Sequence, residues 1–241
     1  MLVDINTCFG KTPRKRVDWS PETLVALLGE RDVDRALTYS LRGVLYDFVT
    51  GNDETWEVCR RHEMLIPVAT IDPRRHFGCL DEIERCADRG FSVFRFFPDQ
   101  QGWTVDGAPF LKICETLAEH DVAVMLPAGP AGHQSLVGRE IAPFGFNVVL
   151  VGAGYGSNAE TYAVCTSYDN VFAETHQFAS PGTIEGLAWV AGAHKLMFGS
   201  NSPDRYFGAA RMMVDSADLS ETDRAAILGH NAVRYLRLEG F

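Results

Sequence analysis

Two residues able to exchange protons lie two positions apart near the end of an apolar run, in the phrase VFAETHQF. Because side chains alternate along a β-strand, Glu174 and His176 are expected to share one face. A carboxylate that orients an imidazole makes a general acid–base pair. Asn6 and Cys8 share a face near the start of the chain, and a thiol beside His176 could act as a thiolate nucleophile. We therefore interpret Glu174, His176 and Cys8 as the candidate catalytic residues.

Other polar residues lie at or after further predicted strand ends. Arg95 ends the run VFRFFP, where its guanidinium either pairs with a carboxylate, most obviously Glu174, or binds a substrate anion in bidentate fashion. Internal pairing is favoured because an unpaired buried charge is costly. Trp103 is expected either to cover the site or to anchor its own loop. The candidate substrate-binding residues are Arg95, Asn6, Asn201, Trp103 and His133.

A basic run, KTPRKR at positions 11–16, follows the first predicted strand in an otherwise acidic chain. Such a run can steer a small anionic ligand towards a site, although it is more often an ordinary solvated loop. Both interpretations stay open at the level of sequence.

The composition limits the classes of function. With 32 acidic and 22 basic residues among 241, the formal net charge is −10, which argues against nucleic acid as a partner. No apolar run approaches the length of a membrane span, and the start MLVDIN lacks the features of a signal peptide. The six cysteines form no C-x-x-C pair, a distribution typical of reduced thiols. We expect a single domain over residues 1–241, located in the cytoplasm and without a membrane partner.

The chain alternates short apolar runs with segments of helical period. Strands are predicted at 2–8, 35–41, 65–71, 91–97, 122–126, 147–151, 171–176 and 195–200. Helices are predicted at 21–34, 53–62, 80–89, 109–120, 135–141, 159–168, 183–193 and 220–238, with a final helical region beginning near 208. Eight strand–helix units in this length favour an α/β fold of the (β/α)8 TIM-barrel type, with an open doubly wound sheet as the rival. Function would then lie at the carboxyl ends of the strands.

Several of these phrases resemble the amidohydrolase-related family of metal-dependent TIM-barrel hydrolases and decarboxylases. MLVDINTCFG is similar to its opening strand, VAVMLPAG to the fifth, NVVLVGAG to the sixth and VFAETHQF to the seventh. LMFGSNSPDRY resembles the eighth-strand phrase Phe-Gly-Ser-Asp-x-Pro, and LGHNAVRYL the closing helix. The resemblance implies a hydrolase or lyase acting on a small carboxylate or amide, and it makes a homo-oligomer plausible.

The departures from the family pattern concern its metal ligands. Where the resemblance places ligands, this chain has Asn6, Cys8, Pro127, Gly152 and Asn201. A catalytic zinc needs about three good ligands, so we expect a divergent member with no cofactor and no metal ligands. Three alternatives remain: a polar plug without catalysis, a metal-free acid–base site, or a relocated divalent metal at Cys8, Glu174 and His176.

Two other functions are weighed against an enzyme of this kind. One is a pseudoenzyme, a barrel that binds a small anion or a protein partner without turnover, suggested by the five changed positions. The other is a dinucleotide-binding unit, suggested by Gly152, Gly154 and Gly156 between a predicted strand and a predicted helix. Against the second, the motif follows five earlier strand–helix units, whereas such a fingerprint usually opens its domain.

Overall fold

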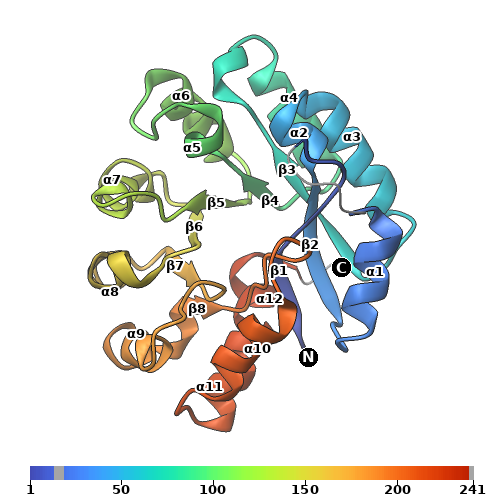
Figure 1. Ribbon diagram of the computed structural model, residues 1–241. Coiled ribbons are helices and arrows are strands. Elements are labelled where there is room, and N and C mark those ends of the chain that lie inside the picture. The colour runs from blue at the N-terminus through green and yellow to red at the C-terminus, as the bar shows by residue number, and fades with distance from the viewer. Residues whose placement is uncertain (14–18, 239–241) are drawn as a thin grey trace.

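Eight parallel strands form a ring surrounded by helices in the computed structural model, which describes residues 1–13 and 19–238 (Figure 1). The strands follow one another around the ring in sequence order, which confirms the predicted (β/α)8 TIM barrel and excludes the open doubly wound sheet. They are β1 (Val3–Phe9), β2 (Arg35–Ser40), β3 (Leu65–Thr70), β4 (Val93–Arg95), β5 (Ala123–Pro127), β6 (Asn147–Val151), β7 (Val171–Glu174) and β8 (Leu196–Met197).

The helices lie outside this ring in the expected order (Figure 1). They are α1 (Pro21–Gly29), α2 (Leu41–Leu45), α3 (Phe48–Cys59), α4 (Cys79–Asp88), α5 (Pro98–Gln101), α6 (Ala108–Leu117), α7 (His133–Glu140), α8 (Asn158–Ser167), α9 (Thr183–Ala191), α10 (Phe207–Asp215), α11 (Glu221–Ala225) and α12 (Asn231–Tyr235). The sequence did not predict the short α2 and α5. It also placed the start of α3 too late, because Asp47 caps that helix by accepting a hydrogen bond from the Thr50 N–H at 2.8 Å.

Alternation along each strand divides the buried apolar side chains into two layers. Within β4, Val93 belongs to the layer inside the barrel, while Phe94 belongs to the layer between barrel and helices. Arg95 therefore shares the inward direction of Val93, at the carboxyl end of the strand. Tyr39 in β2 and Glu174 in β7 follow the inward-facing Leu37 and Phe172 in the same way. The parallel sheet thus brings these end residues to one mouth.

The ring closes between β8 and β1 through few hydrogen bonds. The Ile5 N–H donates to the Phe198 carbonyl at 3.0 Å, and the Cys8 N–H donates to the Ser202 carbonyl at 3.0 Å. Asp4 strengthens this seam, because its buried carboxylate accepts hydrogen bonds from the Asn6 and Ser200 N–H groups at 3.0 and 2.9 Å. A bulge between positions 4 and 7 of β1 accompanies these bonds.

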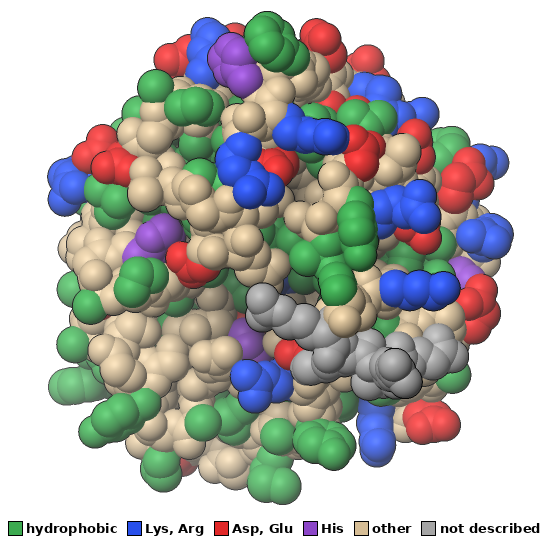
Figure 2. All heavy atoms as spheres, turned by 45° about the horizontal axis from the view of Figure 1, so that its top comes forward, with side chains coloured by type: hydrophobic (Ala, Val, Ile, Leu, Met, Phe, Trp, Pro, Cys, Tyr) green, Lys and Arg blue, Asp and Glu red, His purple; other side chains and the backbone are tan. Residues whose placement is uncertain are grey.

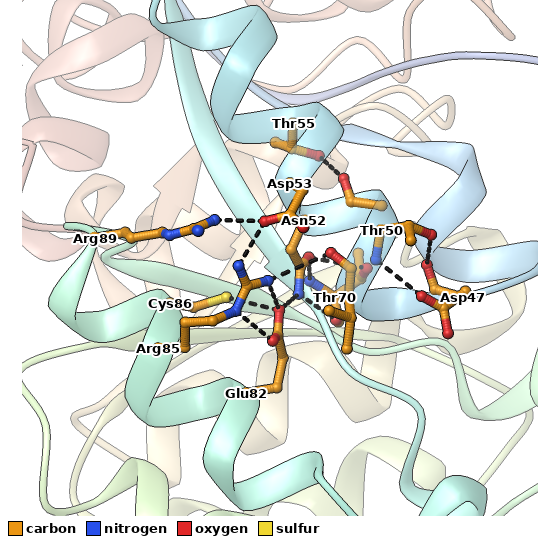
Figure 3. Close-up of polar contacts among 12 residues, drawn as sticks. Asp47, Thr50, Asn52, Asp53, Thr55, Thr70, Glu82, Arg85, Cys86 and Arg89 are labelled. Carbon is orange, nitrogen blue, oxygen red and sulfur yellow. Dashed lines mark hydrogen bonds and ion pairs between the residues drawn. The ribbon is translucent and has the colours of Figure 1, made fainter.

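A second polar cluster, the helix network, consists of Asn52, Asp53, Glu82 and Arg85 between α3 and α4 (Figure 3). Asn52 and Glu82 are buried, and Arg85 is partly buried. Asn52 accepts a hydrogen bond from the Thr70 N–H at 2.8 Å and donates to the Thr70 carbonyl at 3.0 Å. It thereby bonds both backbone groups of Thr70, the last residue of β3. Because Thr70 is the register partner of Arg95, this network fixes the strand beside the mouth.

All six cysteines are buried free thiols, in agreement with the expectation of reduced cysteines. In the part of the chain that the structure describes, no helix is both long enough and apolar enough to cross a membrane.

Candidate active site at the barrel mouth

Glu174 and His176 are in direct contact at the end of β7. The His176 Nδ1 lies 2.5 Å from Glu174 Oε2, and the His176 N–H donates to Glu174 Oε1 at 2.7 Å. Their side chains are 0% and 5% exposed, so this pair is shielded from bulk water. Glu174 fixes the imidazole through Nδ1, and the other ring nitrogen, Nε2, has no hydrogen bond among the described residues. The geometry therefore suits proton transfer at His176 Nε2.

Two glycines leave the space that this pair occupies. A Cβ at Gly199 would lie 2.2 Å from Glu174 Oε1, and one at Gly152 would lie 3.2 Å from His176 Cε1. Gly152 also has a φ of +76°, which favours glycine, and its N–H donates to Glu174 Oε2 at 3.3 Å. In this barrel Gly152 thus serves the carboxylate at the mouth, and the dinucleotide-binding interpretation of its glycine motif is wrong.

Arg95 does not form the expected ion pair with Glu174. Its Nη1 donates to Asn6 Oδ1 at 2.6 Å, and among the described residues no carboxylate oxygen lies within 4.0 Å of its guanidinium. Arg95 is only 9% exposed and lies over the rings of Tyr39 and Phe97, with Cζ 4.9 and 5.2 Å from their centroids. The mouth therefore holds a buried cation with no carboxylate in direct contact among the described residues.

Asn6 links these groups into the mouth cluster, which we define as Asn6, Arg95, Glu174 and His176. Its Oδ1 accepts from Arg95, while its Nδ2 lies 3.5 Å from Glu174 Oε2 and 3.4 Å from His176 Nδ1. The structure therefore places Asn6 beside the acid–base pair.

Cys8 lies beside Tyr39 rather than completing the acid–base pair. The two are register partners in β1 and β2, and a side-chain hydrogen bond joins them. Burial raises the pKa of the Tyr39 hydroxyl well above its ordinary value, against the opposing charge of Arg95. Tyr39 consequently stays protonated at neutral pH. Cys8 remains a candidate by position, but its observed partner is this phenol.

The other candidates occupy different surroundings. Trp103 packs edge-on against Phe96, in the layer outside the barrel, and its indole N–H donates to Gln101 Oε1 at 2.9 Å. It therefore anchors its loop. His133 begins α7 with its ring against Gly129, and burial lowers its pKa. Asn201 is half-buried after β8 with a φ of +57°, a conformation that asparagine tolerates better than most residues. Of the basic run, Lys11 is exposed, and 14–16 lie outside the described residues.

The structure adds three residues that sequence analysis did not single out. Tyr39 and Phe97 supply the aromatic faces under Arg95, and Asp4 holds the bulge before Asn6. An acidic residue inside the apolar phrase MLVDIN was a usable signal for Asp4, because a buried carboxylate needs partners. Nothing in the sequence distinguished Tyr39 or Phe97 from ordinary core aromatic residues.

The acid–base residues lie at the carboxyl ends of the strands, which is the face where TIM-barrel enzymes have their active sites. The family model described as amidohydrolase matches residues 25–238, so the chain belongs to the amidohydrolase family. No curated protein sequence matches it.

Solved structures with the same fold are distant in sequence. A 5-carboxyvanillate decarboxylase from Novosphingobium aromaticivorans, complexed with manganese and a nitrobenzoic acid, is 15% identical with a TM-score of 0.78, covering 98% of this chain and 96% of that one. A dihydroxybenzoic acid decarboxylase from a Polaromonas species, with bound manganese and 2-nitroresorcinol, is 16% identical with a TM-score of 0.75, covering 98% and 97%. A 2,6-dihydroxybenzoate decarboxylase from Rhizobium is 16% identical with a TM-score of 0.73, covering 99% of each chain.

The prediction of no cofactor is wrong by this comparison. Two of these barrels were crystallised with manganese, which points to a divalent metal as a cofactor in the family. The residues present at this mouth offer too few ligands for such an ion, because Asn6 Oδ1 bonds a guanidinium, Glu174 Oε2 bonds His176 Nδ1, and His176 Nε2 is the one donor that the mouth cluster leaves free. Among the described residues no group of three or more histidine, cysteine or acidic side chains could hold a metal ion, so Cys8, Glu174 and His176 do not form the relocated site.

Proposed function

We propose that this member of the amidohydrolase family is a hydrolase or lyase that binds a small carboxylate at the mouth cluster. The observation that carries the proposal is Arg95, a guanidinium only 9% exposed with no carboxylate partner within 4.0 Å among the described residues. Because a buried charge without a direct partner is costly, a bound anion would supply the charge-assisted hydrogen bonds that Arg95 lacks. The pseudoenzyme alternative has no support from the relatives, which are decarboxylases acting on small aromatic carboxylates.

The described side chains divide the work between them. Arg95 would bind a carboxylate or phenolate oxygen, and the rings of Tyr39 and Phe97 would line an aromatic substrate's approach. His176 would pass a proton through Nε2 while Glu174 holds the ring through Nδ1. Asn6 ties the anion-binding half to the proton-transferring half. Asn201 and Cys8 are proposed to position the substrate from neighbouring strand ends.

For a lyase, elementary electrostatics decides which substrate oxygen Arg95 holds. In a decarboxylation the C–C bond breaks, carbon dioxide leaves, and the bonding electrons remain on a carbon that takes a proton from His176. A guanidinium bound to the departing carboxylate would stabilise the ground state more than the transition state. In that reaction Arg95 would bind a different anionic group, such as an ortho phenolate, and an aromatic hydroxy acid is the favoured substrate. A carboxylate that does not react, such as that of benzoate, can still bind the same guanidinium.

The experiment is a turnover screen of hydroxybenzoates, including 2,6-dihydroxybenzoate and 5-carboxyvanillate, run with and without added Mn²⁺. On any substrate turned over, Glu174→Gln and His176→Ala should each lower kcat by about 10²–10⁴-fold. Arg95→Met should mainly raise KM. If both Glu174→Gln and His176→Ala retained full turnover, the assigned acid–base pair would be wrong.

A further inference from the structure

A separate cavity opens beside the mouth, between residues 9–11 and 19–21 on one side and α2 and α3 on the other. This rim cavity has a volume of about 1010 Å³, and Phe9, Lys11, Trp19, Arg42, Tyr46 and Glu54 are among its lining residues. None of the mouth cluster lines it. Its volume is of the order of the larger small-molecule sites in proteins. It therefore has room for a ligand of its own.

The acidic groups of the rim cavity already have partners. Glu54 accepts a hydrogen bond from Ser40 Oγ at 2.7 Å and lies 3.6 Å from Arg42 Nε. Asp47 accepts from the Thr50 N–H at 2.8 Å and pairs with Arg75, and these contacts, the backbone bond above all, lower its pKa. The carboxylates of this wall are thus occupied by protein donors.

The cations of the rim cavity are less completely paired than its carboxylates. Lys11 is exposed and forms no ion pair with any residue in the described ranges, and the Arg42 side chain is 58% exposed with only the 3.6 Å contact to Glu54. Figure 2 shows Lys and Arg side chains intermixed with Asp and Glu side chains over the right-hand side of this view. At the opening of the cavity, the exposed Lys11 therefore supplies the positive charge.

The remaining wall is aromatic and apolar. Phe9 is fully buried and Trp19 is 7% exposed, while Tyr46, at 65% exposed, stands at the opening. Rings of this kind contribute apolar contact area and a flat face on which another ring can stack. The cavity thus combines an aromatic interior with a basic rim.

We propose that the rim cavity is a second binding site, which takes an aromatic anion: a ring system carrying a carboxylate, sulfonate or phosphate. The ring would lie against Trp19 and Tyr46, and the anionic group would bind Lys11 and Arg42. The site does not depend on the chemistry of the mouth, because the two share no lining residue.

The test is a calorimetric and fluorescence titration with 2-naphthalenesulfonate. We expect one-to-one binding that quenches tryptophan fluorescence, with the quenching lost in Trp19→Phe. A Lys11→Gln/Arg42→Gln double variant should bind at least about tenfold more weakly, since it removes two charge-assisted contacts. The matched control is Lys112→Gln/Arg139→Gln, which removes two exposed cations from α6 and α7 and should leave the affinity unchanged.

Three results would overturn the proposal: no binding at millimolar probe, equal affinity in the two double variants, or loss of binding in Arg95→Met. The last would show that the probe occupies the mouth, which leaves the proposed function intact. Suppose instead that Arg95→Met still binds the probe and that the wild type turns over no hydroxybenzoate. The rim cavity would then be confirmed as a binding site, while the proposed function of the mouth would have failed.

Discussion

The helix network and the mouth cluster contain the same three kinds of side chain in different arrangements. In the helix network Arg85 forms two 2.7 Å contacts with Glu82 and a further ion pair with Asp53 (Figure 3). Asn52 bonds the backbone of Thr70. These acidic partners raise the pKa of Arg85 above its ordinary value. The network is complete within the protein, so its role is to hold α3, α4 and β3 together.

In the mouth cluster the arginine and the glutamate are kept apart. Arg95 bonds the amide of Asn6, and Glu174 bonds His176 instead. Glu174 is occupied by protein donors, but Arg95 keeps capacity for a group that is not part of the described chain, whereas Arg85 and Glu82 satisfy each other. The comparison teaches that an arginine shielded from water, such as Arg95, marks a binding site when it has no carboxylate partner. An arginine that has such a partner, such as Arg85, stabilises the fold.

Breaking the helix network should have the largest effect on stability. Glu82→Ala leaves Arg85 partly buried without its main partner and removes one of the two acceptors of the Asn52 amide, so we expect a loss of about 3–5 kcal/mol in the free energy of unfolding. Urea denaturation measures it. The folded fraction should still bind a small carboxylate such as benzoate, and a loss below 1 kcal/mol would contradict the role assigned to this network.

Asp4 is a third buried carboxylate, beside Glu82 and Glu174. It has no cationic partner among the described residues and can lose its charge by binding a proton. Burial raises its pKa to about 7, so between about pH 4 and pH 7 the folded state binds more protons than the unfolded state. As the pH rises through that window, the free energy of unfolding of the wild type should therefore fall, relative to that of Asp4→Asn, by up to about 4 kcal/mol. Urea titrations of both proteins at several pH values measure this difference, and parallel pH profiles would contradict the prediction.

Removing the unpaired cation should weaken binding while sparing the fold. Arg95→Met keeps the length of the side chain and removes one buried charge, so stability should stay the same or rise. Benzoate should lose about 1.5–3 kcal/mol of binding free energy, roughly 10- to 100-fold in Kd. Calorimetry with Arg85→Met as the matched control sharpens the contrast, because that variant should lose stability and keep benzoate affinity in its folded form.

The smallest expected effect is at Gly152. Gly152→Ala places a non-glycine residue at a φ of +76°, which costs about 1–2 kcal/mol, and moves its methyl group to 3.2 Å from His176 Cε1. A displaced imidazole should change the pH dependence of turnover as well as its rate. The alternative outcome, an unchanged pH profile with reduced stability only, would show that Gly152 does not position His176.

The sequence was sufficient for the ring of strands and for the neighbourhood of Glu174 and His176. Apolar runs such as NVVLV have the pattern of strands covered on both faces, and residues two apart on one strand must share a side. The partner of Arg95 could not be predicted in the same way, because the stagger between distant strands decides whether it meets Glu174 or Asn6. Trp103 shows the same limit: its anchoring depends on Phe96, whose outward direction only the closed barrel fixes.

The seam between β8 and β1 determines where the barrel opens most easily. Strand β8 has two residues, and the few backbone bonds across the seam lie directly beneath the mouth cluster. Regions with few backbone bonds open at lower free energy than the rest of a fold. Local opening of the ring is therefore expected first at this seam, whereas β3, which Thr70 ties to α3, should stay protected, and amide hydrogen exchange would show the difference.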